Sequence, residues 1–290
     1  MNVSRRRFLA IAASFAAAPA MAQRSTWTGR AFGAEASINL HGPAAMTGPA
    51  LDAAQALIKQ IEELFSLYDP ASDLSQLNAT GVRTVSAPFE MLIGHVDRAH
   101  DLTDGLFDPT VQPLWRALVD GGDVAAARTL VGWDRVDRRA NHVRLGTGQA
   151  LTFNGIAQGF ATDLVADLLR ERGFNRTLVN IGEHRGTGGA WRLGLIDPVH
   201  GLLAHRTISD GAVATSSPLA TPIGPQGHIL HAEHTPRWST VSVEAETAAM
   251  ADALSTGLVL ADFNLVKRVR NAKGVHRITL VDPGGDLTTL

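Results

Sequence analysis

The order in which helical and strand-like patterns follow one another is the feature that most constrains the fold of this 290-residue chain. Apolar residues at helical spacing predict helices at residues 52–67, 87–104, 160–172 and 247–260. Strand-like patterns occur at residues 28–40, 142–145, 150–153, 176–181, 191–196, 239–245 and 277–281. Because the two kinds of segment do not alternate strictly, the sequence predicts an α+β fold with mixed sheets and packed helices, in a single compact unit, rather than a doubly wound parallel sheet.

The first 22 residues have the pattern of an export signal. Ser4-Arg5-Arg6-Arg7-Phe8-Leu9 is a twin-arginine run, and Ala20-Met21-Ala22 has the small residues of a cleavage site. The apolar stretch between them is too short to span a bilayer. We therefore expect residues 1–22 to be a twin-arginine signal peptide and residues 23–290 to form a mature, periplasmic protein without a membrane span. The chain contains no cysteine, so we expect neither a lipid anchor at the cleavage site nor disulfides.

The balance of charges argues against one class of partner. The full chain has 26 basic and 28 acidic residues, and removal of the expected signal peptide would take away three arginines and no acid. A mature chain with this net negative charge is not expected to bind nucleic acid or an anionic membrane surface.

Asp252 and Thr256 are four residues apart in the predicted helix of residues 247–260, where Thr247 is a plausible N-cap. Residues i and i+4 lie on one face of a helix, so the carboxylate and the hydroxyl point to the same place. Oxygen ligands of this kind suit Mg²⁺. The ordinary alternative for this pair is a solvated aspartate near a helix start, followed by an unremarkable threonine.

Four segments occur in an order that is typical of one enzyme family. They are Leu67-Tyr68-Asp69, Asp104 to Val111 with its Phe107-Asp108-Pro109-Thr110 core, Asn154 to Asp163, and Ala251 to Thr256. With these segments the sequence resembles the ApbE family of FAD:protein FMN transferases over nearly all of the expected mature chain. Weaker matches lie at Val179–Glu183 and Ala214–Ser216. The form Asn154-Gly155-Ile156-Ala157-Gln158-Gly159 is most similar to the branch that accompanies nitrous-oxide reductase maturation.

The resemblance implies a Mg²⁺-dependent enzyme that splits the pyrophosphate of FAD, releases AMP, and joins FMN to a Thr or Ser of another protein. We expect that acceptor to be a periplasmic or membrane-bound redox protein. Mg²⁺ would be bound by the side chains of Asp252 and Thr256 and by the carbonyl of Gly155, and Ser255 holds a further metal-associated position. Such a cation neutralises the charge that develops when a pyrophosphate breaks.

The resemblance also implies a flavin pocket. Tyr68 would be an aromatic platform, His228 would be the base that deprotonates the acceptor hydroxyl, and five further residues would contact FAD: Leu106, Phe107, Asp108, Gln158 and Leu230. Thr152 stands at the position that reads the adenosine part. Four of these residues have an ordinary alternative, which is core packing for Tyr68 and Phe107, a turn residue for Asp108, and a loop histidine for His228.

The sequence departs from the family pattern at five places. The usual Met-Gly-Thr is Phe32-Gly33-Ala34, the usual Asp near adenosine is Thr152, and a usual Lys or Glu is the neutral Gln158. The usual Ser-Gly is replaced at Ser216-Ser217-Pro218, and the Asp-Pro turn expected after His228 is missing from residues 231–235.

These departures keep other functions open. One alternative is a non-catalytic relative that binds FAD and delivers flavin, and another is a Mg²⁺-dependent FAD pyrophosphatase. The histidines at positions 228, 231 and 234 also raise the possibility of a second metal site, against the simpler interpretation of a histidine-rich loop.

Overall fold

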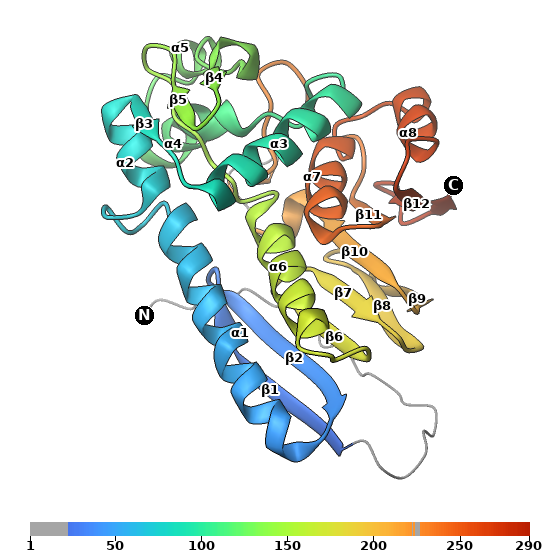
Figure 1. Ribbon diagram of the computed structural model, residues 1–290. Helices are drawn as coiled ribbons and strands as arrows, with labels where there is room; N and C mark the ends of the chain where they lie inside the picture. Colours follow the sequence, from blue (N-terminus) through green and yellow to red (C-terminus); the bar gives the residue numbers. More distant parts are fainter. Residues whose placement is uncertain (1–22, 222, 224–226) are drawn as a thin grey trace, which may run out of the picture.

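The computed structural model describes residues 23–221, 223 and 227–290, so the expected signal peptide lies outside the described residues (Figure 1). Helices in the described part are α1 Ala44–Phe65, α2 Asp73–Thr80, α3 Ala87–Leu102, α4 Gln112–Asp120, α5 Val124–Arg128, α6 Ala157–Glu171, α7 Ala248–Leu258 and α8 Phe263–Arg270. The strands are β1 Gln23–Ala31, β2 Ala34–Gly42, β3 Val82–Thr84, β4 Asp137–Arg139, β5 His142–Arg144, β6 Thr177–Asn180, β7 His184–Thr187, β8 Trp191–Asp197, β9 Gly201–Ile208, β10 Gly211–Ser216, β11 Thr240–Ala245, β12 Val275–Val281 and β13 Leu287–Thr289. Their mixture confirms the predicted α+β class.

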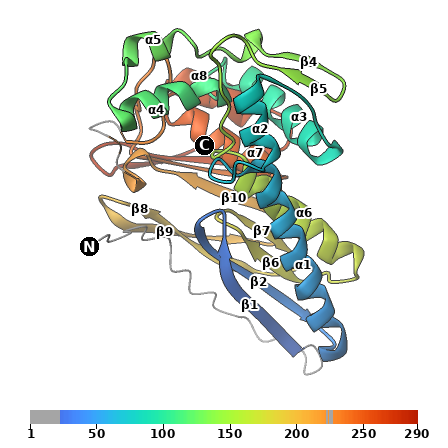
Figure 2. The same ribbon diagram turned by 90° about the vertical axis from the view of Figure 1, so that its left-hand side faces the viewer.

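The larger sheet has the strand order β1-β2-β6-β7-β10-β11-β12-β13, and every neighbouring pair is antiparallel. Helices α1 and α6 lie along one face of this sheet, whereas the β8–β9 hairpin lies on its other side (Figures 1 and 2). The hairpin buries a small core of its own, made of Leu178, Trp191, Leu193, Ile208 and Val213. Helices α1 and α6 cover the main hydrophobic core, which reaches into the rest of the molecule.

The second half of the molecule contains α2 to α5 and the three-stranded sheet β3-β5-β4, and it lies at one end of the larger sheet (Figure 1). Aromatic rings join the two halves. The ring of Phe65 at the end of α1 is 5.2 Å from that of Phe89 in α3, 5.6 Å from that of Phe153, and 6.1 Å from that of Phe160 in α6. The contacts of Phe65 with Phe153 and Phe160 are edge-to-face. Aromatic pairs of this kind stabilise a core beyond the area that they bury, and the two halves share one core.

Helices α6 and α7 are held together at the N-terminal end of α7. The Asp163 carboxylate of α6 accepts the backbone N–H groups of Ala248 and Ala249 at 2.8 and 2.9 Å, and it also receives Arg185 at 2.8 Å. These bonds satisfy donors that an α-helix leaves unpaired at its start. One turn earlier in α6, Gly159 lies so close to α7 that a Cβ at this position would be 2.3 Å from the Ala248 carbonyl oxygen.

This close approach predicts a large effect for Gly159→Ala. The added methyl group would meet backbone atoms, so α6 and α7 must move apart, and overpacking of this kind costs roughly 1–3 kcal/mol. The matched control is Gly94→Ala in α3, where an added Cβ has nothing within 4 Å and should stabilise the helix by roughly 0.5–1 kcal/mol. Thermal melting of both variants checks the prediction. Equal melting temperatures for Gly159→Ala and the wild type would contradict it.

Two strand predictions were wrong. Residues 28–40 form parts of two strands, because Phe32 and Gly33 both adopt positive φ angles, of 50° and 73°, and turn the chain into the β1–β2 hairpin. Residues 150–153 form no strand. The Leu151 N–H bonds to the Asn78 side chain at 2.7 Å and the Thr152 N–H to the Pro109 carbonyl at 2.8 Å. These backbone donors are therefore satisfied without a neighbouring strand.

Candidate active site

A cavity of about 190 Å³ opens where the two halves meet. Its wall comes from the segment at residues 106–111, α4, the segment at residues 152–155, the start of α6, the turn between β6 and β7, the end of β10, the loop after β10, and α7. Ten of the predicted site residues line it: Leu106, Phe107, Asp108, Thr152, Gly155, Gln158, His228, Leu230, Asp252 and Thr256. Segments that lie up to 150 residues apart in the sequence therefore meet at one place.

Asp252 and Thr256 lie one turn apart on α7, as predicted, and both face the cavity. The Thr247 side chain caps this helix by accepting the Met250 N–H. The Asp252 carboxylate is buried, and its Oδ2 accepts the Gly159 N–H at 3.1 Å.

Gly155 lies directly against Thr256. A Cβ at position 155 would be 2.9 Å from the Thr256 hydroxyl oxygen and 3.3 Å from the ring of Phe107, so only glycine fits there without a shift. The Gly155 backbone, the Thr256 hydroxyl and the Asp252 carboxylate thus occupy the same wall of the cavity. This is the set of three ligands that the sequence predicts for Mg²⁺.

Ser255 is buried behind this wall and does not line the cavity. Its hydroxyl is 3.0 Å from the Asp252 carbonyl oxygen and 2.8 Å from the Ser216 hydroxyl. The Ser216 hydroxyl is also 3.2 Å from that of Thr256. Ser255 therefore contacts the predicted metal ligands through hydrogen bonds, and Ser216 links it to Thr256.

Carboxyl groups predominate among the ionisable side chains of the cavity. Its described lining includes the carboxylates of Asp108, Glu183 and Asp252, together with His228, but no Lys or Arg. Burial raises the pKa of Asp252 to about 7, and the nearby charge of Asp163 acts in the same direction, against the Gly159 N–H. Burial and then the charge of Asp252 raise the pKa of Glu183 well above its usual value. Both shifts reflect carboxylates that are held away from water without a cationic partner.

The donor set fits a magnesium ion, because it combines a carboxylate, a hydroxyl and a backbone carbonyl in a partly enclosed space. Within the part of the chain that the structure describes, no three His, Cys, Asp or Glu side chains are arranged to bind a metal ion on their own. A cation at Asp252 would therefore depend on Thr256, on the Gly155 carbonyl and on oxygens of the substrate.

The pKa of Asp252 predicts a pH-dependent stability for the metal-free protein. Because folding raises this pKa, the protonated carboxyl stabilises the fold below about pH 4, and that contribution is lost as the pH rises through about 7. His184 acts oppositely, since burial lowers its pKa to about 4 and its contribution is lost as the pH falls. The gain in melting temperature of Asp252→Asn over the wild type should therefore grow from pH 4 to 7 and then stay constant. A gain that does not change with pH would contradict this expectation.

His228 has the geometry of a base. Its Nδ1 is 2.9 Å from the Pro218 carbonyl oxygen, and its backbone N–H donates to the same oxygen at 3.1 Å. A carbonyl only accepts, so Nδ1 carries the proton and Nε2 carries the lone pair. Gly227 makes this approach feasible, because a Cβ there would be 2.1 Å from the Pro218 oxygen.

The other two histidines of this loop do not join His228. Nδ1 of His231 accepts the backbone N–H groups of Glu233 and His234 at 3.0 and 3.2 Å, and the His231 and His234 rings are 4.8 Å apart. His231 lines a neighbouring hollow, and the active-site cavity is lined by His228. The structure therefore does not assemble the three histidines into the second metal site considered above.

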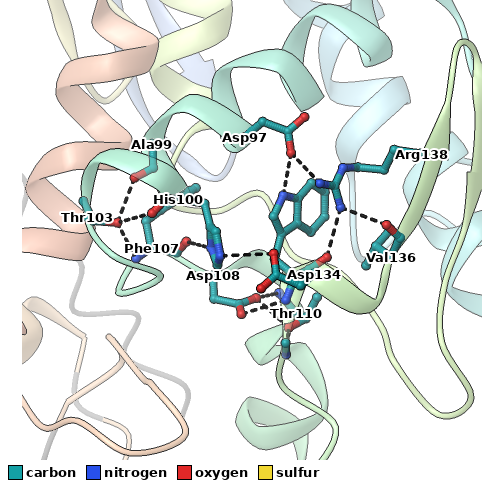
Figure 3. Close-up of polar contacts among 12 residues, drawn as sticks. Asp97, Ala99, His100, Thr103, Phe107, Asp108, Thr110, Asp134, Val136 and Arg138 are labelled. Carbon is teal, nitrogen blue, oxygen red and sulfur yellow. Dashed lines mark hydrogen bonds and ion pairs between the residues drawn. The ribbon is translucent and has the colours of Figure 1, made fainter.

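Asp108 lines the cavity, but its carboxylate is occupied by protein donors (Figure 3). Oδ1 accepts the Thr110 N–H at 2.7 Å and the Thr110 hydroxyl at 2.5 Å, and Oδ2 accepts the Trp133 N–H at 3.0 Å. The Thr110 hydroxyl in turn accepts the Gly132 N–H at 2.7 Å. Asp108 thus braces the cavity wall against the loop at residues 132–133.

A second set of bonds fixes Phe107 (Figure 3). Its backbone N–H donates to the Thr103 hydroxyl at 3.0 Å, and its carbonyl lies 3.0 Å from Nδ1 of His100. Behind them, the Trp133 indole donates to Asp97 at 2.7 Å and the Arg138 guanidinium lies 4.4 Å from the Trp133 ring. This support holds the Phe107 ring against Gly155, and the Cβ and backbone nitrogen of Phe107 against Gly257.

Of three further residues predicted to contact FAD, Gln158 and Thr152 line the cavity and Tyr68 does not. Tyr68 is 83% exposed and is not among the residues that line the cavity, so its role as an aromatic platform stays a prediction. Gln158 lies against the turn at Gly182, where a Cβ would be 2.4 Å from its amide nitrogen. The Thr152 hydroxyl accepts the Asn154 N–H at 3.3 Å at the rim of the cavity.

Comparison with known proteins identifies this arrangement. A model of the ApbE family matches residues 32–279. The chain belongs to the ApbE family. Two curated relatives are FAD:protein FMN transferases of Klebsiella pneumoniae, 30% identical over 55% of this chain and 56% of that protein, and of Haemophilus influenzae, 25% identical over 79% of this chain and 78% of that protein. The stronger of these two matches thus spans just over half the length of the Klebsiella protein.

Solved structures share the ApbE fold. The flavin transferase ApbE from Vibrio cholerae has a TM-score of 0.80 at 23% identity, with coverage of 93% of this chain and 97% of that chain. The flavinyl transferase ApbE from Pseudomonas stutzeri, in its apo form, has a TM-score of 0.79 at 23% identity, with coverage of 93% and 94%. At this level of identity the likeness establishes the fold.

Proposed function

We propose that this ApbE protein transfers FMN from FAD to a Thr or Ser hydroxyl of a partner protein, with Mg²⁺, and releases AMP. The observation that carries the proposal is the cavity that Asp252, Thr256, Gly155 and His228 line together, with no Lys or Arg in its described lining. A pyrophosphate is an anion, so it binds beside these carboxylates only together with a cation. The relatives' activity as FAD:protein FMN transferases supports the same substrate and reaction.

The reaction that this geometry supports is a displacement at the phosphorus of the FMN half. The acceptor oxygen forms a bond to that phosphorus, the bond to the bridging oxygen breaks, and AMP leaves with that oxygen. The acceptor proton passes to Nε2 of His228, whose lone pair faces away from the Pro218 carbonyl. A bound Mg²⁺ would neutralise the pyrophosphate charge. Asp252, Thr256 and the Gly155 carbonyl would hold the ion.

The volume of the cavity is sufficient for only part of an FAD molecule. Pockets for ligands of drug size usually measure roughly 300–1,000 Å³, whereas this one measures about 190 Å³. The pyrophosphate and the nearest part of the flavin would fill it between Phe107 and Leu230, and the rest of FAD would extend along the surface. The flanking surface would then be shared with the acceptor protein.

We propose the periplasm as the location of the reaction, on the basis of the twin-arginine pattern in residues 1–22. A periplasmic or membrane-bound redox protein is the expected acceptor, and the Asn154–Gly159 segment favours one that acts in nitrous-oxide reductase maturation. None of the helices in the described part of the chain is both long and apolar enough to cross a bilayer.

A direct assay separates the proposal from its two alternatives. The purified protein is incubated with FAD, Mg²⁺ and a candidate acceptor, and the products are examined by gel fluorescence and mass spectrometry. Acceptor that gains the mass of FMN, with stoichiometric AMP, supports transfer. AMP and free FMN without labelled acceptor would identify a pyrophosphatase. Bound FAD with no AMP would identify a flavin-binding protein and refute the proposal.

A further inference from the structure

Glu183 is a cavity-lining carboxylate that the sequence patterns do not assign to the site. It stands in the turn between β6 and β7, where Gly182 has a φ of 91° and its N–H donates to the Asn180 side chain at 3.1 Å. The Glu183 carbonyl accepts the Thr162 hydroxyl of α6 at 3.3 Å and the Ile181 N–H at 3.2 Å. The backbone of Glu183 is therefore fixed from the sheet and from α6 together.

The Glu183 side chain reaches the strand that carries Ser216. Its Oε2 accepts the Thr215 N–H of β10 at 3.2 Å. The ladder between β7 and β10 ends at the pair His184 and Val213, so this N–H lies just beyond the last strand pair. Ser216, the next residue, contacts Ser255 and Thr256 of α7. Glu183 is thereby brought to the same wall of the cavity as Asp252 and Thr256.

The Asp252 carboxylate is buried and the Glu183 side chain is half-buried at the same cavity, whose described lining offers them no Lys or Arg. Isolated charges of one sign are costly in a low-dielectric environment unless a cation is shared between them. The Thr215 N–H occupies Oε2, and the hydrogen bonds described for this side chain leave Oε1 to the cavity.

We propose that Glu183 and Asp252 hold the same divalent cation, so that Glu183 is a ligand of the metal in addition to Asp252, Thr256 and Gly155. The inference rests on the proposed function, because it concerns the cation used in that reaction. A shared cation explains why the cavity contains the Glu183 carboxylate in addition to the Asp252 carboxylate, which already lies beside the Thr256 hydroxyl.

A purely structural role for Glu183 would be to accept the Thr215 N–H, and two variants separate this role from metal binding. Glu183→Gln keeps an oxygen that accepts this N–H but removes the charge. Glu183→Asp keeps the charge on a shorter side chain. The control is Glu35→Gln, which removes a carboxylate from an exposed position of β2.

The experiment titrates the full chain with Mn²⁺ in the presence of FAD, followed by electron paramagnetic resonance, and separately measures thermal melting in the presence of a chelator. We expect Glu183→Gln to weaken Mn²⁺ binding by roughly 10- to 100-fold, as loss of a charged partner at a metal site does. Glu183→Asp should retain part of the affinity, and Glu35→Gln all of it. Without metal, Glu183→Gln should melt at the same or a higher temperature than the wild type, because one repulsive charge is gone.

The outcomes distinguish this inference from the proposed function. Wild-type protein that binds no Mn²⁺ would refute the cation site itself and with it the proposed reaction. Wild-type binding that Glu183→Gln leaves unchanged would refute only the role of Glu183. Weaker binding together with a lower metal-free melting temperature would assign Glu183 a structural role and also overturn the inference.

Discussion

Asp252→Asn should slow Mg²⁺-dependent flavin transfer by about 10³-fold or more, which corresponds to the several kcal/mol that a catalytic cation supplies. Asparagine keeps an oxygen that accepts the Gly159 N–H, so the bond between α6 and α7 survives. What disappears is the charge that holds the cation against the pyrophosphate. Asp252→Ala, which also loses the oxygen, should abolish turnover.

Initial rates of acceptor labelling at saturating FAD, with increasing Mg²⁺, measure this effect. The fold is checked by the metal-free melting temperature, which should not fall in Asp252→Asn because a buried charge is removed. Wild-type turnover in either variant would show that the cation is bound elsewhere.

His228→Ala should slow transfer by roughly 10²- to 10⁴-fold, the usual contribution of a general base. The expected loss lies in the chemical step, because His228 accepts the proton of the acceptor hydroxyl through Nε2. The affinity for FAD and Mn²⁺ should therefore change little. Single-turnover labelling rates and equilibrium FAD binding measure the two effects separately.

His231→Ala is the matched control for His228→Ala. It removes a histidine of the same loop whose Nδ1 bonds to backbone N–H groups outside the cavity. This variant should keep a rate close to that of the wild type. If His228→Ala transferred flavin at the wild-type rate, His228 would not be the base of the reaction.

Local patterns predicted the parts of the site that lie within one element. The i, i+4 spacing of Asp252 and Thr256, with Thr247 as N-cap, was enough to place both side chains on one face of α7. Gly173 ends α6 with a φ of 87°, and this was also predictable because glycine after an apolar helix is a local signal.

Contacts between distant elements were not predictable from such patterns. The position of Glu183 is determined by the β6–β7 turn and by the hydrogen bond that its side chain accepts from Thr215, a residue 32 positions later in the sequence. The bond from Asp108 to Trp133 joins positions 25 residues apart, and no local spacing indicates it. The resemblance to a family placed ten cavity residues because it carries tertiary information that periodicity lacks. The β1–β2 hairpin was missed because Phe32, a residue that rarely adopts a positive φ, occupies its turn.

The hydrogen bonds of Asp163 and Gly159 between α6 and α7 separate the proposed cation site from the loop that carries the proposed base. Bonds between carboxylates and backbone N–H groups join α6, which begins two residues after Gly155, to α7, which carries Asp252, and none of these bonds involves the loop that follows β10. That loop supplies His228 and Leu230 to the cavity. Substitutions at His228 or Leu230 should therefore leave the arrangement of the proposed cation ligands unchanged, because none of those ligands lies in that loop.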